Sequence, residues 1–457
     1  MGADAVRFLD LLAAAGISVW QVLPLNPPDG HRSPYCSSSL FAGDPGLLPR
    51  PTSQSVRALD IEGRTDVMPG ATPGEFAASD APIADSLSFW LRDFAIFSVA
   101  HETFATSWND WPAPLRDRQP AAITKFVRDH SARIAFVEAR QVEFIKAWRQ
   151  LRDAAHLRGI SLFGDVPLYP SYDSADVWAH RELFQLASDG SMKFVAGVPP
   201  DYFSPTGQLW GNPIYDWSAN AADNFAWWHA RFAHAATLFD VVRIDHFRGL
   251  EAYWRVPADA VDASSGVWAE GPGMALFAAL GAGSVDALVA EDLGDITPEV
   301  DALRLQLNLP GMRVLQFGFS GDPLNPHLPE RVPTHCVYYT GTHDNDTTLG
   351  WYKTLDAEAR RAVDRLLESA PATAQGAIAS KSSMPWPLIV RALACAANTT
   401  IVPLQDLLGL DGAARMNVPG AAAGNWTWRF SWEQIPGDLV PRLRSLVSAS
   451  SRLPGMG

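Results

Sequence analysis

The stretch VRIDHFRG at 242–249 decides how this chain can fold, because in it an apolar run ends abruptly in an acidic residue. AEDLGDITPE at 290–299 and GTHDNDTTLGWY at 341–352 repeat the layout. The acidic residues that end the three runs are Asp245, Glu291 and Asp344. The carboxyl ends of parallel strands meet on one face of a barrel, so the pattern predicts that these side chains converge. Two facing carboxyl groups are what the cleavage of a sugar acetal requires.

Short apolar runs that end in polar residues predict buried parallel strands. They cover 17–23, 160–166, 239–244, 287–290, 313–317, 335–339 and 398–402. Helical patterns lie between most of them, which predicts an α/β fold. Polar residues at several strand ends favour a (β/α)8 barrel of the triosephosphate isomerase type. A doubly wound sheet is the alternative, but the sequence has no Gly-x-Gly-x-x-Gly turn after a strand and no phosphate-binding loop.

The domain organisation follows from the same patterns. We predict a single catalytic barrel domain over residues 1–457, with helical and loop insertions. Apolar residues recur at helical spacing from Ser86 onward, which predicts a helical insertion over 50–150. Residues 176–217 are predicted to form a loop insertion that covers the active site.

The composition indicates a folded protein with a neutral ligand. Of 457 residues, 47% are hydrophobic and 19% charged, enough to bury a large core. The formal net charge of −14 repels nucleic acid and anionic membranes, so neither is expected as a partner. Three distant cysteines without metal-ligand spacing predict no disulfide framework and no metal site. With no long apolar run and no secretion signal, we expect a cytoplasmic protein.

The first candidate site lies at the end of the run around Asp245. Alternate side chains of a strand share a face, so Arg243 and Asp245 can pair. An adjacent guanidinium favours the ionised carboxylate, which suits a nucleophile. The alternative is a structural ion pair that closes a strand end.

Glu291 follows the next run directly, and Asp292 is expected to point the opposite way. If Glu291 lies near Asp245 and Asp344, repulsion and partial burial raise its pKa, as a general acid requires. The alternative for Glu291 or Asp292 is a helix cap or a surface charge.

The third site, THDND, contains His343, Asp344 and Asp346. It lacks the glycine and the terminal glutamate of a calcium-binding loop, so we expect no metal there. An aspartate beside a neutral histidine suits hydrogen bonding to sugar hydroxyls. The alternative is a glycine-rich turn with an Asx cap.

The segment VAGVPPDYFSPTGQLWGNP at 195–213 has the composition of a stiff loop. Its aromatic residues Tyr202, Phe203 and Trp210 can stack on the apolar faces of glucose rings, while Asp201 can bond to hydroxyls. The alternative is that these aromatic residues cap the barrel core.

Long motifs extend along the chain. They are WQVLPL at 20–25, SPYCSSSLFAGDP at 33–45, GDVPLYPSYDSADVW at 164–178, VAGVPPDYFSPTGQLWGNP, VRIDHFRG, AEDLGDITPE, GTHDNDTTLGWY and VPLQDLLGLDGAARMNVPGAAAGNWTWR at 402–429. In these motifs the chain resembles the amylomaltases, the 4-α-glucanotransferases also called disproportionating enzymes, over essentially its whole length.

The resemblance implies roles for the candidate residues. Asp245 is expected to be the nucleophile, Glu291 the general acid/base and Asp344 the stabiliser of the transition state. The residues expected to bind substrate are Arg243, His343, Tyr35, Asp201, Tyr202, Phe203, Trp210 and Asp165.

The resemblance also implies the reaction, a retaining double displacement on α-1,4-glucans and maltooligosaccharides that needs no cofactor. An α-glucan hydrolase with the same carboxylates is one alternative. A non-catalytic α-glucan-binding protein is the other, if the barrel lacks a strand.

Two features depart from the family. Its members usually begin with a further strand and a glycine-rich turn ahead of the helix that here starts near Ala3, so we expect a barrel lacking its usual first strand. The segment NPPDGHRSPYC at 26–36 replaces the Gly-Tyr-Gly-Asp stretch that the family commonly has before Ser-Pro-Tyr.

Overall fold

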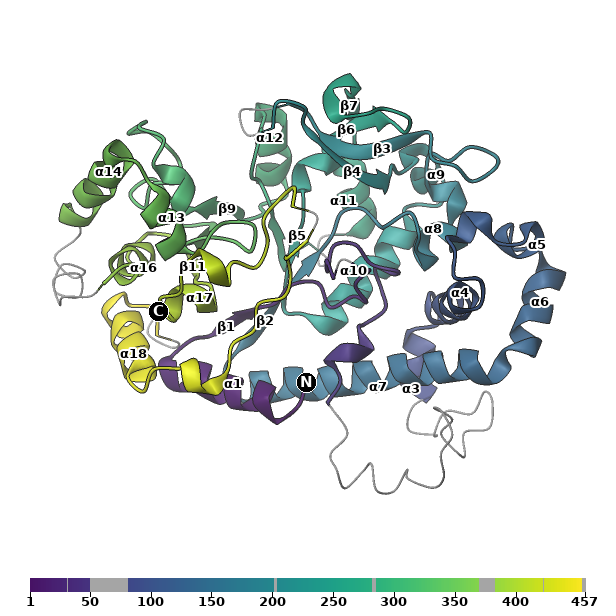
Figure 1. The fold of residues 1–457 in the computed structure, drawn as a ribbon, viewed down its shortest axis with the longest axis horizontal. Coiled ribbons are helices and arrows are strands. Elements are labelled where there is room, and N and C mark those ends of the chain that lie inside the picture. Colours follow the sequence, from purple (N-terminus) through teal and green to yellow (C-terminus); the bar gives the residue numbers. More distant parts are fainter. Residues whose placement is uncertain are drawn as a thin grey trace.

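The computed structural model describes residues 1–30, 32–49, 81–200, 204–281, 285–369, 383–421 and 423–453. Within them the chain forms an α/β barrel with helices around it and a second, antiparallel sheet beside it (Figure 1).

Seven parallel strands of the described chain form the barrel wall. Four lie side by side in the order β1-β2-β5-β8, and three in the order β9-β10-β11. Their bounds are β1 Val19–Gln21, β2 Ser161–Val166, β5 Val241–Ile244, β8 Leu288–Ala290, β9 Gly311–Val314, β10 Cys336–Tyr339 and β11 Thr399–Ile401. Each predicted strand is confirmed. The strand predicted over 313–317 begins and ends earlier, at Gly311–Val314, because the residues after Val314 form a 3-10 turn over Leu315–Gly318.

A carboxylate and one backbone hydrogen bond join the two groups of strands. The N–H of Ala290 donates to the C=O of Pro310 at 2.9 Å, and the N–H of Met312 donates to Asp292 Oδ1 at 2.6 Å. A β-carbon at Gly311 would lie 2.4 Å from the Asp292 carboxylate, so a glycine is required for this close approach.

Alternation along the strands separates two apolar layers. One layer receives side chains from all seven wall strands and fills the barrel interior. Its members on the wall strands are Val19, Phe163, Val241, Val289, Met312, Val314, Val337, Tyr339 and Ile401. The intervening residues, such as Leu162, Val242 and Leu288, point outward and pack in the larger core against the helices.

Helices lie outside the wall, where some pack against its strands and others against further helices (Figure 1). They are α1 Ala3–Ala15, α3 Ala81–Ser86, α4 Leu91–Phe104, α5 Ala113–Arg116, α6 Pro120–Asp129, α7 Ser131–His156, α8 Ala175–Ala179, α9 Trp217–Ala222, α10 Ala226–Leu238, α11 Met274–Leu280, α12 Pro298–Gln306, α13 Thr348–Thr354, α14 Ala357–Glu368, α16 Trp386–Leu393, α17 Leu404–Leu407 and α18 Leu439–Ala449. The 26-residue α7 packs against α4, and α1 packs against α18, so the two ends of the chain lie on one side of the barrel (Figure 1).

The segment 195–213, predicted to be a stiff loop, instead contains two strands of an antiparallel sheet. This sheet has the order β4-β3-β6-β7, with β3 Phe194–Val198, β4 Gln208–Pro213, β6 Ala252–Pro257 and β7 Val267–Glu270. The prediction failed because β3 is held by β6, a strand more than 50 residues away, whose pairing outweighs the local loop composition.

The predicted insertions stay predictions as structural units. Within 50–150 the structure describes α3 to α6 and most of α7, whereas residues 50–80 lie outside the described part of the chain. The predicted covering segment 176–217 contains β3 and β4.

Gly164 in β2 offers a test of packing behind the wall. A β-carbon there would lie 2.2 Å from the ring of Phe239. We expect Gly164→Ala to lower the free energy of unfolding by about 1–3 kcal/mol in chemical denaturation, because the ring has to shift. Gly437→Ala is the control, since nothing lies within 4 Å of the added atom. Equal stability of the two variants would contradict the packing described for β2.

Candidate active site

A buried arginine links the ends of two neighbouring wall strands. Strand pairing places Asp165 of β2 beside Arg243 of β5. The Nη1 atom of Arg243 lies 2.7 Å from both carboxylate oxygens of Asp165 and 2.9 Å from Asp245 Oδ1. The exposed fraction is 7% for the Arg243 side chain, 1% for Asp165 and 27% for Asp245. The predicted pairing of Arg243 with Asp245 is confirmed, and Asp165 is a second partner.

Asp165 is surrounded by protein groups. Besides Arg243, it binds the Tyr35 hydroxyl, which donates to Oδ2 at 2.6 Å. Burial foremost, and then the charge of Asp165, raise the pKa of Tyr35 well above its usual value, so this hydroxyl keeps its proton as a donor. The predicted contact of Asp165 with substrate stays a prediction.

The Asp245 carboxyl is recessed but accessible. Burial raises its pKa to about 6, Arg243 opposes this rise, and the charges of Asp165 and Asp344 add to it. At neutral pH the ionised form therefore predominates. The exposed part of the carboxylate can still meet a ligand.

Glu291, directly after β8, has a different environment. Burial raises its pKa to about 8, Arg243 lowers it, and the charge of Asp245 raises it further. The N–H of His246 donates to Glu291 Oε2 at 2.7 Å, which favours the ionised form but does not offset the burial. The adjacent Asp292 points outward as predicted, and at 3% exposure it is not the surface charge of the alternative interpretation.

Asp344 lies in the turn after β10. Asn417 Nδ2 donates to Asp344 Oδ1 at 2.6 Å, and Arg415 Nη2 donates to the Asp344 carbonyl at 2.7 Å. His343 Nε2 is 3.4 Å from Asp344 Oδ2, and burial lowers the pKa of this histidine, which favours the neutral ring at pH 7. Among the described residues no group of three or more His, Cys, Asp or Glu side chains could hold a metal ion.

Aromatic side chains border the acidic cluster on two sides. Tyr35 stacks on His343 with ring centroids 5.3 Å apart, and the ring centroid of Trp426 lies 5.9 Å from that of Tyr35. On β4, Trp210 meets His246 edge-on at 4.7 Å and remains 36% exposed. Trp210 therefore lies next to the residue whose N–H binds Glu291.

The structure thus brings together most of the predicted site residues. They are Asp245, Glu291, Asp344, Arg243, His343, Tyr35, Asp165 and Trp210. The remaining three, Asp201, Tyr202 and Phe203, lie outside the described residues.

The sequence analysis did not single out His246, Asn417 or Trp426. His246 binds Glu291 through its backbone, at a left-handed φ of 49° that a motif of residue types does not reveal. Asn417 and Trp426 come from a long loop 70 residues or more after Asp344. Their only signal was membership of the 402–429 motif.

A barrel with carboxyl groups of separated pKa at the carboxyl ends of its strands has the arrangement of enzymes that act on glycosidic bonds. Comparison with protein families identifies which of these enzymes the chain is related to. The model described as 4-alpha-glucanotransferase matches residues 1–62 and 83–434. The chain belongs to the 4-alpha-glucanotransferase family and is a glycosyl-transferring enzyme.

Individual relatives carry the name of the same family. The 4-alpha-glucanotransferase of Thermus thermophilus is 41% identical over 486 residues, covering 99% of this chain and 95% of the relative. That of Aquifex aeolicus is 40% identical, covering 94% of this chain and 91% of the relative. These names support the predicted glucan transfer and neither the hydrolase nor the non-catalytic alternative.

Solved structures confirm the barrel fold. The amylomaltase from Streptococcus agalactiae, in complex with acarbose, superposes with a TM-score of 0.87 at 30% identity, covering 99% of this chain and 95% of that one. The amylomaltase from Corynebacterium glutamicum has a TM-score of 0.70 at 16% identity, covering 98% of this chain and 72% of that one. It supports the fold alone.

The two raised pKa values predict a bell-shaped dependence of kcat/KM on pH. Activity should fall below about pH 6 as Asp245 gains a proton, and above about pH 8 as Glu291 loses one. Initial rates on maltotriose across this range test the prediction. A profile that stays level through both values would contradict it.

Proposed function

We propose that Asp245 and Glu291 carry out a retaining double displacement that moves α-1,4-glucan segments between maltooligosaccharides. One observation carries the proposal: in a single cluster, the environment keeps Asp245 ionised and Glu291 protonated at neutral pH. A nucleophile and a general acid need these opposite states.

In the first step an Asp245 oxygen attacks the anomeric carbon of the bound glucan. The bond from this carbon to the glycosidic oxygen breaks, and Glu291 transfers its proton to that oxygen. The shorter glucan leaves with a new 4-hydroxyl group. The remaining segment is then held as an ester of Asp245.

In the second step Glu291, now a carboxylate, takes the proton from the 4-hydroxyl of an incoming sugar. The oxygen of that sugar attacks the anomeric carbon and displaces the Asp245 carboxylate. Both carboxyl groups return to their starting states, and the configuration at the anomeric carbon is retained.

Arg243 and Asp165 support the nucleophile. The guanidinium lies against Asp245, which favours the charged carboxylate that each cycle regenerates. Asp165 holds Arg243 in turn and is itself held by Tyr35. We assign Asp165 a positioning role, because its oxygens already bind protein groups.

Asp344 and His343 are proposed to bind two neighbouring hydroxyls of the reacting sugar. The Asp344 side chain is 47% exposed, and Asn417 fixes the orientation of one of its oxygens. Such hydrogen bonds can strengthen as the ring flattens toward the oxocarbenium-like state.

The choice between transfer and hydrolysis depends on the acceptor site. Trp210 borders the Glu291 side of the cluster, where the incoming sugar is deprotonated. A sugar stacked on an indole displaces water from that position. We propose the same role for Tyr202 and Phe203.

The substrate and the compartment fit the surface chemistry. A neutral glucan is not repelled by a protein with a net charge of −14, whereas nucleic acid is. Among the described helices, none has the length and apolar character needed to cross a membrane. We propose that the enzyme acts in the cytoplasm on maltodextrins.

Maltotriose tests the proposed reaction. The purified protein should convert it to glucose and a ladder of longer maltodextrins, separable by chromatography. Asp245→Asn should lower kcat by roughly three orders of magnitude or more, because the nucleophile is lost. The exposed Asp259→Asn is the matched control and should behave like the unsubstituted protein. Only shorter products, or full activity of Asp245→Asn, would refute the mechanism.

Trp210→Ala tests the acceptor site. We expect the KM for the acceptor to rise several-fold and the hydrolysed fraction to increase, since a stacking interaction of about 1 kcal/mol is lost. Trp210→Phe keeps an aromatic face and should show a smaller change. An unchanged ratio of transfer to hydrolysis in Trp210→Ala would exclude this role for Trp210.

A further inference from the structure

The three carboxyl groups of the site are held by different kinds of partner. Asp245 contacts the guanidinium of Arg243, and Asp344 accepts a hydrogen bond from the Asn417 side chain. The hydrogen bond to Glu291 comes instead from a backbone N–H in the turn after β5. The position of Glu291 therefore depends on how firmly this turn is held.

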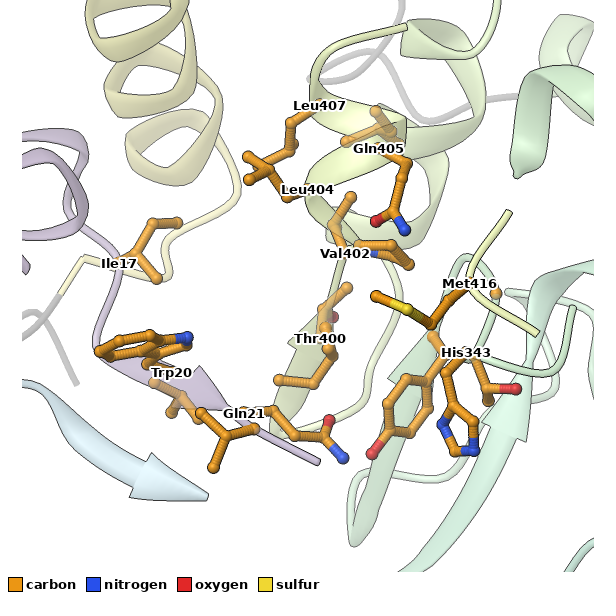
Figure 2. Close-up of a pocket in the computed structure, with 18 of the residues that line it drawn as sticks. Ile17, Trp20, Gln21, His343, Thr400, Val402, Leu404, Gln405, Leu407 and Met416 are labelled. Carbon is orange, nitrogen blue, oxygen red and sulfur yellow. The ribbon is translucent and has the colours of Figure 1, made fainter. Parts of the chain in front are cut away.

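The Asp344 side of the site has a support of its own. Figure 2 shows Met416 close to His343 in the lining of a cavity. The N–H of Asn417 donates to the C=O of His343 at 3.1 Å, so the segment that contains Met416 runs along the turn after β10. The corresponding support for Glu291 lies in the turn after β5.

The turn after β5 contacts the Glu291 loop at two points. It contains a 3-10 helix, η4 Phe247–Leu250, which follows the left-handed His246. The N–H of His246 donates to Glu291 Oε2 at 2.7 Å, and Arg248 Nη1 donates to the C=O of Asp295 at 2.9 Å. Asp295 is four residues after Glu291 in the sequence. One turn thus holds both the Glu291 side chain and the backbone that follows it.

Arg248 is buried and depends on an indole ring for its position. Its side chain is 5% exposed, and its guanidinium carbon lies 3.7 Å from the centre of a Trp268 ring. The Nε atom of Arg248 has no hydrogen-bond partner in the described part of the chain. A guanidinium over an indole face is attracted by the ring quadrupole, more strongly where water is excluded. The Trp268 ring therefore stabilises a guanidinium that hydrogen bonds satisfy only in part.

Trp268 belongs to a well-packed support. It lies on β7 directly opposite Trp254 of β6, and the two indole rings meet edge-on with centroids 5.1 Å apart. The segment after β7 packs on the end of η4. The N–H of Gly271 donates to the C=O of Glu251 at 2.7 Å, and a β-carbon at Gly271 would lie 2.4 Å from the Leu250 carbonyl oxygen. The antiparallel sheet thus holds the turn that contacts Glu291.

We propose that Arg248 and Trp268 are positioning residues for the general acid/base, because they fix the Glu291 loop against η4. The inference rests on the functions proposed above for Asp245 and Glu291. A carboxyl group that protonates the leaving oxygen and then deprotonates the acceptor has to reach the same oxygen position in both steps. A displacement of about 1 Å can lower a rate by roughly 100-fold. In this role neither Arg248 nor Trp268 exchanges a proton.

Steady-state rates on maltotriose test the two residues. Arg248→Met keeps the aliphatic stem but loses the charge and the bond to Asp295, so kcat should fall by about tenfold or more. Trp268→Ala removes the ring from Arg248 and should lower kcat by about three- to tenfold, whereas Trp268→Phe keeps an aromatic face and should recover most of this loss. Val267→Ala is the matched control. Val267 is the neighbouring residue of β7, points to the opposite face and is 51% exposed, so kcat should not change.

An activated substrate separates a positioning role from general damage. α-Maltosyl fluoride loses fluoride without a proton, so Asp245 can form its ester without help from an acid. Azide then attacks the anomeric carbon without help from a base, which frees the Asp245 carboxylate and gives α-maltosyl azide. With these two reactants Glu291→Gln, Arg248→Met and Trp268→Ala should all come within about threefold of the unsubstituted rate.

Two results would overturn the proposal. One is full activity of both Arg248→Met and Trp268→Ala on maltotriose. The other is a loss in these variants that fluoride and azide do not relieve, although they relieve Glu291→Gln. If Arg248→Met fails to fold by circular dichroism, Trp268→Ala decides, because its ring is 40% exposed.

The reference variant distinguishes this inference from the proposed function. Glu291→Gln should lose roughly 100-fold or more on maltotriose and regain activity with the fluoride and azide. If it does not regain activity, the general acid/base role of Glu291 is wrong, and the positioning role falls with it. Relief of Glu291→Gln alone would leave the proposed function intact and refute the roles of Arg248 and Trp268.

Discussion

The buried guanidinium of Arg243 is the interaction on which the site depends. A charge at 7% exposure is stable only with partners, and the strand register supplies Asp165 from β2 while Asp245 comes from the same strand. Removing one partner of a buried ion pair typically costs about 3–5 kcal/mol. The same contact that stabilises Arg243 also fixes the position of Asp245. Stability and the placement of the proposed nucleophile are therefore coupled.

The difference between the two carboxyl groups follows from what each one touches. Burial raises the pKa of both. Asp245 has a guanidinium at 2.9 Å, whereas the hydrogen bond to Glu291 comes from one backbone N–H, and the charge of Asp245 acts against its ionisation. The proton therefore stays on Glu291. Two carboxyl groups at the ends of neighbouring strands acquire opposite proposed roles from their surroundings.

Much of this arrangement could be predicted, because it depends on local periodicity. Apolar runs located the seven wall strands, and alternation placed Arg243 with Asp245 and turned Asp292 away from Glu291. Pairings between distant segments could not be predicted. The β3–β6 ladder converted an expected loop into sheet. The carboxylate that holds Arg243 across the strands and the amide that holds Asp344 also come from segments more than 70 residues away.

Side chains join neighbouring wall strands in addition to the backbone ladders. Asp292 joins β8 to β9 through the N–H of Met312, and the Asp165–Arg243 contact reinforces β2 against β5. The contact that positions Arg243 in the site therefore also holds two neighbouring wall strands together.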